Sequence, residues 1–148
     1  MKRPGFSVKE AARITGVPAT SVNFWSGRAK ILRPEIAYRG KGSRKLFSAR
    51  NLVQIRVTYL LTQRWIPLAT VRALIKKSYW FDLQQSAWGP AEILVCRRTS
   101  EWHLRSSGVT AAARPTELLD ALWDDLANRE DIIVVNLARV KHTIREAL

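Results

Sequence analysis

The sequence predicts a mainly α protein of the α+β class, in which a strongly basic helical half precedes a small α+β module. The 148 residues are 47% hydrophobic and carry a formal net charge of +13, so the chain can form a core as one domain or two very small ones. Residues 1–77 hold 17 Lys and Arg against two acidic residues, whereas residues 78–148 hold eight against ten. Because folded surfaces normally mix both signs, the first half is expected to bind nucleic acid, the commonest polyanion. An idle basic surface is the alternative.

The first two helices are expected around a tight turn. Ser7-Val8-Lys9-Glu10 matches a capping box, and Gly16 should end the helix that it begins. Pro18 then begins a second helix, with Val22 and Trp25 on one face. This order predicts a helix-turn-helix, whose second helix presents its N-terminal residues to base edges in the major groove. The residues that the first helix should bury are Val8, Ala11, Ala12 and Ile14.

A basic hairpin and two more helices are expected next. Extended pieces at 35–39 and 44–47 flank Gly40-Lys41-Gly42-Ser43, which is typical of a β-hairpin lying along the phosphate backbone as a wing. A flexible basic loop is the alternative. Ser48 should cap a third helix over residues 49–64, residues 63–66 should end it, and Pro67 should open a fourth over residues 68–77. The residues that the fourth helix should bury are Leu68, Val71, Leu74 and Ile75.

The order of these motifs resembles the MerR-type winged helix-turn-helix. The resemblance runs from Phe6 to about Lys77 and rests on Phe6–Ala12, Thr15–Val17, Val22–Trp25 and Ser43–Ser48, followed by two helices. It implies a dimeric protein that reads an inverted repeat in double-stranded DNA, with its wings on the backbone. The long coiled coil that usually follows the fourth helix is missing from the pattern after Ser78, so activation by DNA distortion is not implied.

The resemblance also places individual residues. Thr20, Ser21 and Asn23 fall on the recognition helix, and Trp25 takes the place of its usual aromatic residue. Asn23 stands where many members carry Arg, so the base preference is not transferred. Arg64 falls in the loop that serves as a second wing. The residues expected to contact DNA are Ser7, Thr20, Ser21, Asn23, Arg28, Arg39, Lys41, Arg44, Lys45 and Arg64.

The second half is predicted to be a separate module. A DNA-binding domain over residues 1–77 and a linker over 78–90 should precede it, and the module itself should span 91–148. The patterns predict strands at 92–97, 101–105 and 131–137, and helices at 115–128 and 138–148. So small a unit is expected to dimerise, to sense a ligand or to bind a partner protein. The acidic face of the helix at 115–128 is a solvated face, a surface docked on the basic half, or a partner surface.

Chemistry-bearing residues are few. Cys96 has no partner for a disulfide or a metal cluster, and His103 and His142 are scattered. No enzyme activity, metal or cofactor is therefore expected. Trp80, Trp88 and Trp102 are interpreted as core or interface residues, with a flat ligand pocket as the alternative. No apolar run is long enough for a membrane span and no secretory signal is recognisable, so a cytoplasmic, nucleoid-associated protein is expected.

These observations predict a bacterial, sequence-specific transcription regulator, acting as a homodimeric repressor or activator on an inverted-repeat operator. The alternative is an antitoxin that covers a toxin with its second half and represses its own operon through its first. A third possibility is an excisionase-like architectural protein that bends DNA at clustered direct sites.

Overall fold

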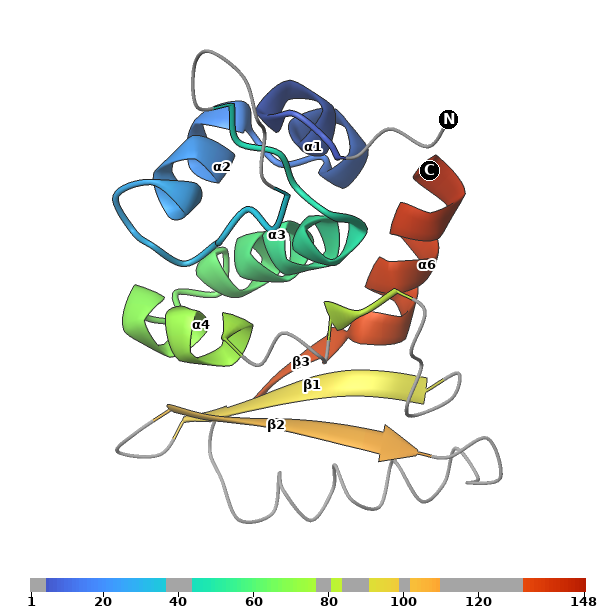
Figure 1. Cartoon of the computed structure of the whole chain (residues 1–148). Helices are drawn as coiled ribbons and strands as arrows, with labels where there is room; N and C mark the ends of the chain where they lie inside the picture. Colours follow the sequence, from blue (N-terminus) through green and yellow to red (C-terminus); the bar gives the residue numbers. More distant parts are fainter. Residues whose placement is uncertain (1–4, 37–43, 77–80, 84–90, 99–101, 110–131) are drawn as a thin grey trace. The chain divides into compact units, whose positions relative to one another are not determined.

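The computed structural model describes residues 5–36, 44–76, 81–83, 91–98, 102–109 and 132–148. Two compact units make up the chain: Met1–Leu83 together with Val140–Leu148, and Gln84–Arg139. The sequence predicts a DNA-binding domain over residues 1–77 and a separate module over 91–148. In the structure, Val140–Leu148 group with the first unit instead. The first unit is helical (Figure 1), as predicted for the basic half.

A helix-turn-helix opens the first unit. It consists of α1 (Val8–Thr15) and α2 (Ala19–Ser26). The predicted capping box is confirmed: the Glu10 amide donates to Ser7 Oγ at 3.3 Å, and the Ser7 amide donates to Glu10 Oε2 at 2.9 Å. Gly16 ends α1 in the left-handed conformation, with φ of +69°. Of the residues that α1 was expected to bury, Ala11 is fully buried, and the other three are half-buried.

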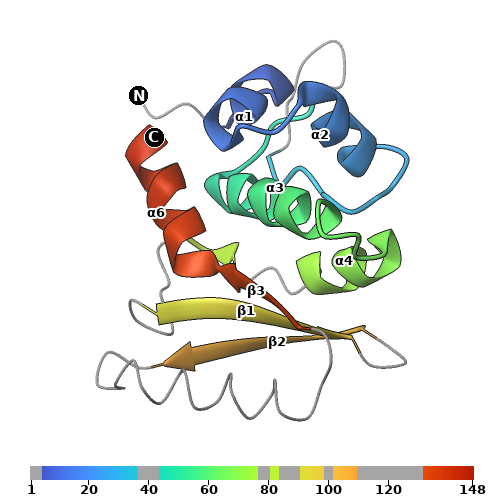
Figure 2. The same ribbon diagram turned by 180° about the vertical axis from the view of Figure 1, so that it is seen from behind.

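The second pair of helices is α3 (Ala49–Thr62) and α4 (Leu68–Ile75). Ser48 caps α3 as predicted, and its hydroxyl accepts from the amide of Asn51 at 3.1 Å. In Figures 1 and 2, α3 lies between the α1–α2 pair and α4, so α3 is the helix that the others pack against. Its buried apolar residues are Leu52, Val53, Ile55, Val57 and Leu61.

The prediction for Leu68 is wrong. Val71, Leu74 and Ile75 are buried as expected, but Leu68 is 37% exposed. Pro67 is the N-cap of α4, so Leu68 is the first helical residue. The buried face of the helix begins one turn later, which leaves Leu68 at its exposed margin.

Short antiparallel bridges join three segments at the base of the predicted wing. Ile36 pairs with Leu46, and Phe6 pairs with Phe47 through two hydrogen bonds of 2.9 and 2.8 Å. The first bridge lies between the two pieces that the hairpin prediction paired. The tip of that hairpin, residues 37–43, lies outside the described residues.

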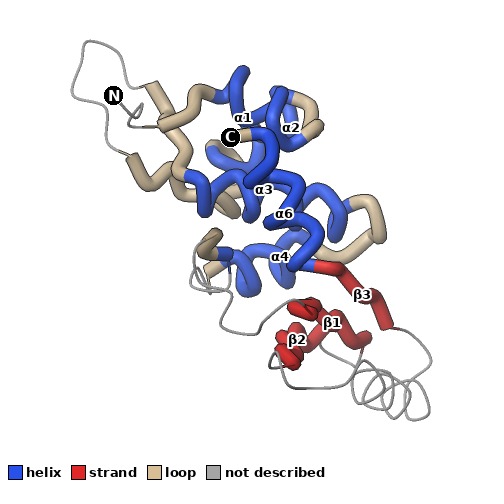
Figure 3. The backbone as a smooth tube through the Cα atoms, turned by 90° about the vertical axis from the view of Figure 1, so that its right-hand side faces the viewer, coloured by secondary structure: helices blue, strands red, loops and turns tan. Residues whose placement is uncertain are grey.

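The second unit contains a three-stranded antiparallel sheet in the order β2-β1-β3 (Figure 3). Its strands are β1 (Ala91–Arg98), β2 (Trp102–Val109) and β3 (Ile132–Asn136), close to the three predicted strands. The helix expected at 115–128 lies outside the described residues, so the module as a whole stays a prediction. The last helix, α6 (Leu137–Ala147), follows β3 directly, as the sequence predicts.

Candidate nucleic-acid interface

The helix α2 has one buried face and one exposed face, and the exposed face carries Phe24, 44% exposed, beside polar residues. Val22 is fully buried and Trp25 is 5% exposed, three residues further along the same face. Thr20 and Asn23 are exposed and Ser21 is half-buried. Thr20 and Asn23 therefore lie on the outer side of α2, where a hydroxyl and an amide group can reach a ligand, and Ser21 lies at the margin of that side.

The C-terminus of α2 is held by the side chain of Lys45, which directly precedes the bridge residue Leu46 at the base of the wing. The Lys45 ammonium donates to Ser26 Oγ at 3.3 Å, and the Ser26 hydroxyl donates to the carbonyl of Val22 at 2.8 Å. A Cβ added to Gly27 would lie 3.5 Å from Lys45 Nζ and 3.0 Å from the Asn23 carbonyl. The Lys45 ammonium therefore lies where the partial negative charge of the helix end favours a cation. Its bond to Ser26 fixes α2 to the base of the wing.

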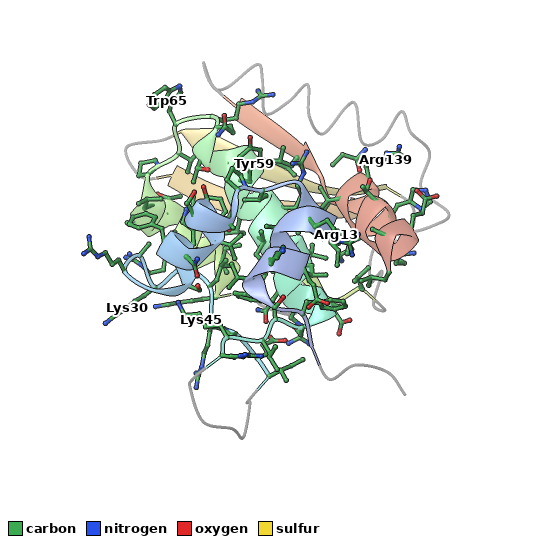
Figure 4. All side chains as sticks on the ribbon, turned by 90° about the horizontal axis from the view of Figure 1, so that it is seen from above. Arg13, Lys30, Lys45, Tyr59, Trp65 and Arg139 are labelled. Carbon is green, nitrogen blue, oxygen red and sulfur yellow. The ribbon has the colours of Figure 1, made fainter. Side chains whose placement is uncertain are left out.

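Exposed cations follow α2 directly. Arg28 and Lys30 are both exposed, and Lys30 has a positive φ of 50°. Figure 4 shows Lys30 and Lys45 extending to the same side of this unit. Arg44, next to Lys45, is exposed as well. Arg39 and Lys41, also predicted to contact DNA, lie outside the described residues.

The acidic residues of this half are engaged with their own neighbours. Glu10 and Glu35 are the only two before Asp82 in the sequence. The Ser7 hydroxyl, predicted as a DNA contact, donates to Glu10 Oε2 at 2.9 Å. Glu35 pairs with Arg50 at 3.3 Å and accepts from the Ser48 hydroxyl. Ser7 thus has a clear structural role as a helix cap.

A buried amide places the base of the wing against α3. Asn51 is 1% exposed, and its side chain makes four hydrogen bonds. Its Oδ1 accepts from the amides of Glu35 at 3.1 Å and Ser48 at 3.0 Å, and its Nδ2 donates to the Arg33 carbonyl at 3.0 Å and to Gln54 Oε1 at 2.8 Å. Because every polar atom of the amide is used, the start of the wing is fixed relative to α3.

The turn between α3 and α4 carries a residue that the sequence analysis missed. Arg64 is exposed there, as a second-wing residue should be, but Trp65 is 91% exposed and has φ of +60°. The residues 63–66 were interpreted only as a helix break. The sequence did contain a signal. The turn ending at Pro18 has Gly16 two residues before the proline, whereas the turn ending at Pro67 has Trp65 at the matching position.

The helix α4 is tied to the segment after α2. Arg72 donates from Nε and Nη2 to the Ala29 carbonyl, at 3.0 and 2.6 Å. The exposed cations Arg28 and Lys30 flank that carbonyl in the chain. The helix α4 is thus fixed to the segment that carries these two cations.

The first unit thus contains two helices at a Gly turn, a bridged wing base and two further helices. This is the order of elements expected for a MerR-type region. Residues 6–78 match the family model described as MerR HTH family regulatory protein. These residues form a MerR-type helix-turn-helix region. The match confirms the predicted resemblance and points to a DNA-binding transcription regulator. No curated protein matches the chain.

None of the helices in the described ranges is both long and apolar enough to cross a membrane. No three His, Cys, Asp or Glu residues in those ranges come together as a possible metal site.

Proposed function

We propose that the protein is a sequence-specific transcription regulator that binds an inverted repeat in duplex DNA as a homodimer, one MerR-type region on each half-site. The observation that carries this proposal is the exposure of Thr20 and Asn23 on the outer face of α2, with cations close by on the chain. A helix-turn-helix that reads DNA needs this combination of base-edge groups and phosphate contacts. Two copies would give the symmetry that an inverted repeat mirrors.

The residues divide by role in this proposal. Thr20, Ser21 and Asn23 would read base edges, since hydroxyl and amide groups match the donors and acceptors of the major groove. Arg28, Arg44 and Arg64, with Arg39 and Lys41 of the wing, would contact phosphates. Lys45 would act chiefly by holding α2 in place through Ser26, and Ser7 by capping α1. DNA binding would reside in residues 1–77, and dimerisation or partner binding in residues 91–148.

Selection from random duplexes, followed by salt titration of the variants, tests this division. Asn23→Ala is expected to relax preference at one base pair, at a cost of about 1–3 kcal/mol there. Arg44→Ala should weaken binding to all duplexes alike and make the slope of log affinity against log salt shallower by about one unit. Arg145→Ala, which removes an equal charge at an exposed position of α6, is the matched control and should leave the slope almost unchanged.

Light scattering on the purified chain, with and without the selected duplex, tests the dimer. Two chains on one duplex support the proposal. No enrichment of any sequence would rule out sequence-specific binding. A chain that is stable only with a second, co-expressed protein would favour the antitoxin alternative instead.

A further inference from the structure

The turn between α3 and α4 places its largest side chain in a backbone conformation suited to glycine. The Trp65 amide donates to the Thr62 carbonyl at 3.2 Å, and the Ile66 amide donates to the Leu61 carbonyl at 3.3 Å. This pair of bonds is the Schellman pattern, whose left-handed position is usually occupied by glycine because a Cβ is unfavourable there. Trp65 occupies it with φ of +60° and 91% of its surface exposed.

The fold does not require a tryptophan at this position. The side chain that anchors the turn is the next one, Ile66, which is 3% exposed. The first helix-turn-helix has the same sequence of roles: Gly16 in the left-handed conformation, then Val17 at 2% exposure, then the N-cap Pro18. The indole therefore costs conformational energy without contributing to the core, a combination that indicates a binding role.

The surroundings of Trp65 favour an anionic partner. Arg64 precedes it and is exposed, and no acidic residue occurs in the sequence between Glu35 and Asp82. The helix that follows the turn is bonded through Arg72 to the Ala29 carbonyl, beside the exposed Lys30. Figure 4 shows Trp65 projecting away from the ribbon of the first unit. A large apolar ring next to an exposed arginine matches the sugar–phosphate backbone, which offers apolar deoxyribose faces between charged phosphates.

We propose that Trp65 is a DNA-backbone contact, its ring packed on deoxyribose groups that flank the base pairs read by α2, with Arg64 on an adjoining phosphate. This inference rests on the proposed function and adds to it a contact that is neutral and independent of base sequence. It gives the α3–α4 turn an apolar contact beside the charged one proposed for Arg64.

The test compares Trp65→Gly with the wild type on a long random-sequence duplex. Because glycine is favoured in this turn, the variant should fold with an unchanged or higher thermal midpoint. Its affinity should fall roughly tenfold, the effect of losing the burial of one large apolar side chain. The salt slope should stay the same, since an uncharged ring displaces no counterion. Trp65→Phe should retain most of the affinity.

Arg64→Ala is the matched control from the adjoining residue. It should also weaken binding, but with a shallower salt slope. A Trp65→Gly variant with wild-type affinity for the duplex would overturn the inference, as would one that loses self-association or a protein partner while DNA binding stays intact. If the wild type itself binds no duplex, the proposed function fails together with the inference. If the wild type and Trp65→Gly bind the duplex equally well, only the proposed Trp65 contact fails.

Discussion

The two helix pairs of the first unit turn in the same way but differ at one residue. In each, a residue with left-handed φ is followed by a buried aliphatic residue and by a proline that caps the next helix. These residues are Gly16, Val17 and Pro18 in the first turn, and Trp65, Ile66 and Pro67 in the second. The two prolines have nearly the same backbone angles, with φ of −56° and ψ of 135° in one and φ of −57° and ψ of 139° in the other.

The difference separates what the backbone needs from what function adds. The first turn meets its conformational requirement with glycine, at no steric cost. The second turn has Trp65 in the left-handed conformation, where its Cβ is sterically unfavourable and its side chain stays exposed. Two turns with the same order of left-handed residue, buried aliphatic residue and proline thus serve as controls for each other.

Replacing the buried anchor of the second turn should have the largest effect. Ile66→Ala is expected to lower the free energy of unfolding by about 2–5 kcal/mol, because it removes buried methyl groups and leaves a cavity. Val17→Ala, the matched change in the first turn, should cost less because it removes less volume. Urea unfolding of both variants measures the difference. A loss below about 1 kcal/mol for Ile66→Ala would show that another side chain anchors the second turn.

Removing the link between the two pairs should come next. Arg72→Ala deletes both hydrogen bonds to the Ala29 carbonyl and is expected to cost about 1.5–3 kcal/mol, since hydrogen bonds to a charged group are strong. Lys76→Ala, at an exposed position just after α4, is the control and should stay within about 0.5 kcal/mol of the wild type. Equal stabilities for the two variants would mean that these two hydrogen bonds add no net stability, and that apolar packing and other bonds, such as the one from Arg56 Nη1 to the Thr15 carbonyl, hold the pairs together.

Exchanging the residues at the two left-handed positions should change stability in opposite directions. Gly16→Ala is expected to destabilise by about 1–2 kcal/mol; its Cβ would meet only Arg56 Nη1, at 3.9 Å, so strain is the sole cause. Trp65→Gly relieves similar strain but frees the unfolded chain, and a net gain of about 0.5–1 kcal/mol is expected. Thermal unfolding checks both signs. If both variants are destabilised, the indole makes a stabilising contact within the protein.

The sequence predicts the parts of this region whose causes are local. The Ser7 and Ser48 caps, the Gly16 turn and the proline-led helices follow from a few neighbouring residues, and all are found. The roles of Asn51 and Lys45 were not predicted, because their partners are 16 to 19 residues away along the chain. The left-handed Trp65 was missed for a different reason: the propensity rules for such turns look for glycine, and here glycine is absent.

The helix α3, which contacts both α1 and α4, offers the test with the smallest expected effect. Thr58 lies fully buried in α3, and its Oγ1 has no hydrogen-bond partner among the described residues. Thr58→Val keeps the shape of the side chain and removes the buried hydroxyl, so a gain of up to about 1 kcal/mol is expected. Because α3 contacts both α1 and α4, that gain should also appear in the Gly16→Ala and Trp65→Gly backgrounds, as additivity requires of independent sites. A Thr58→Val variant that is less stable than the wild type would show that the hydroxyl is satisfied in solution. An unequal gain in the two backgrounds would show that the turns are coupled through α3.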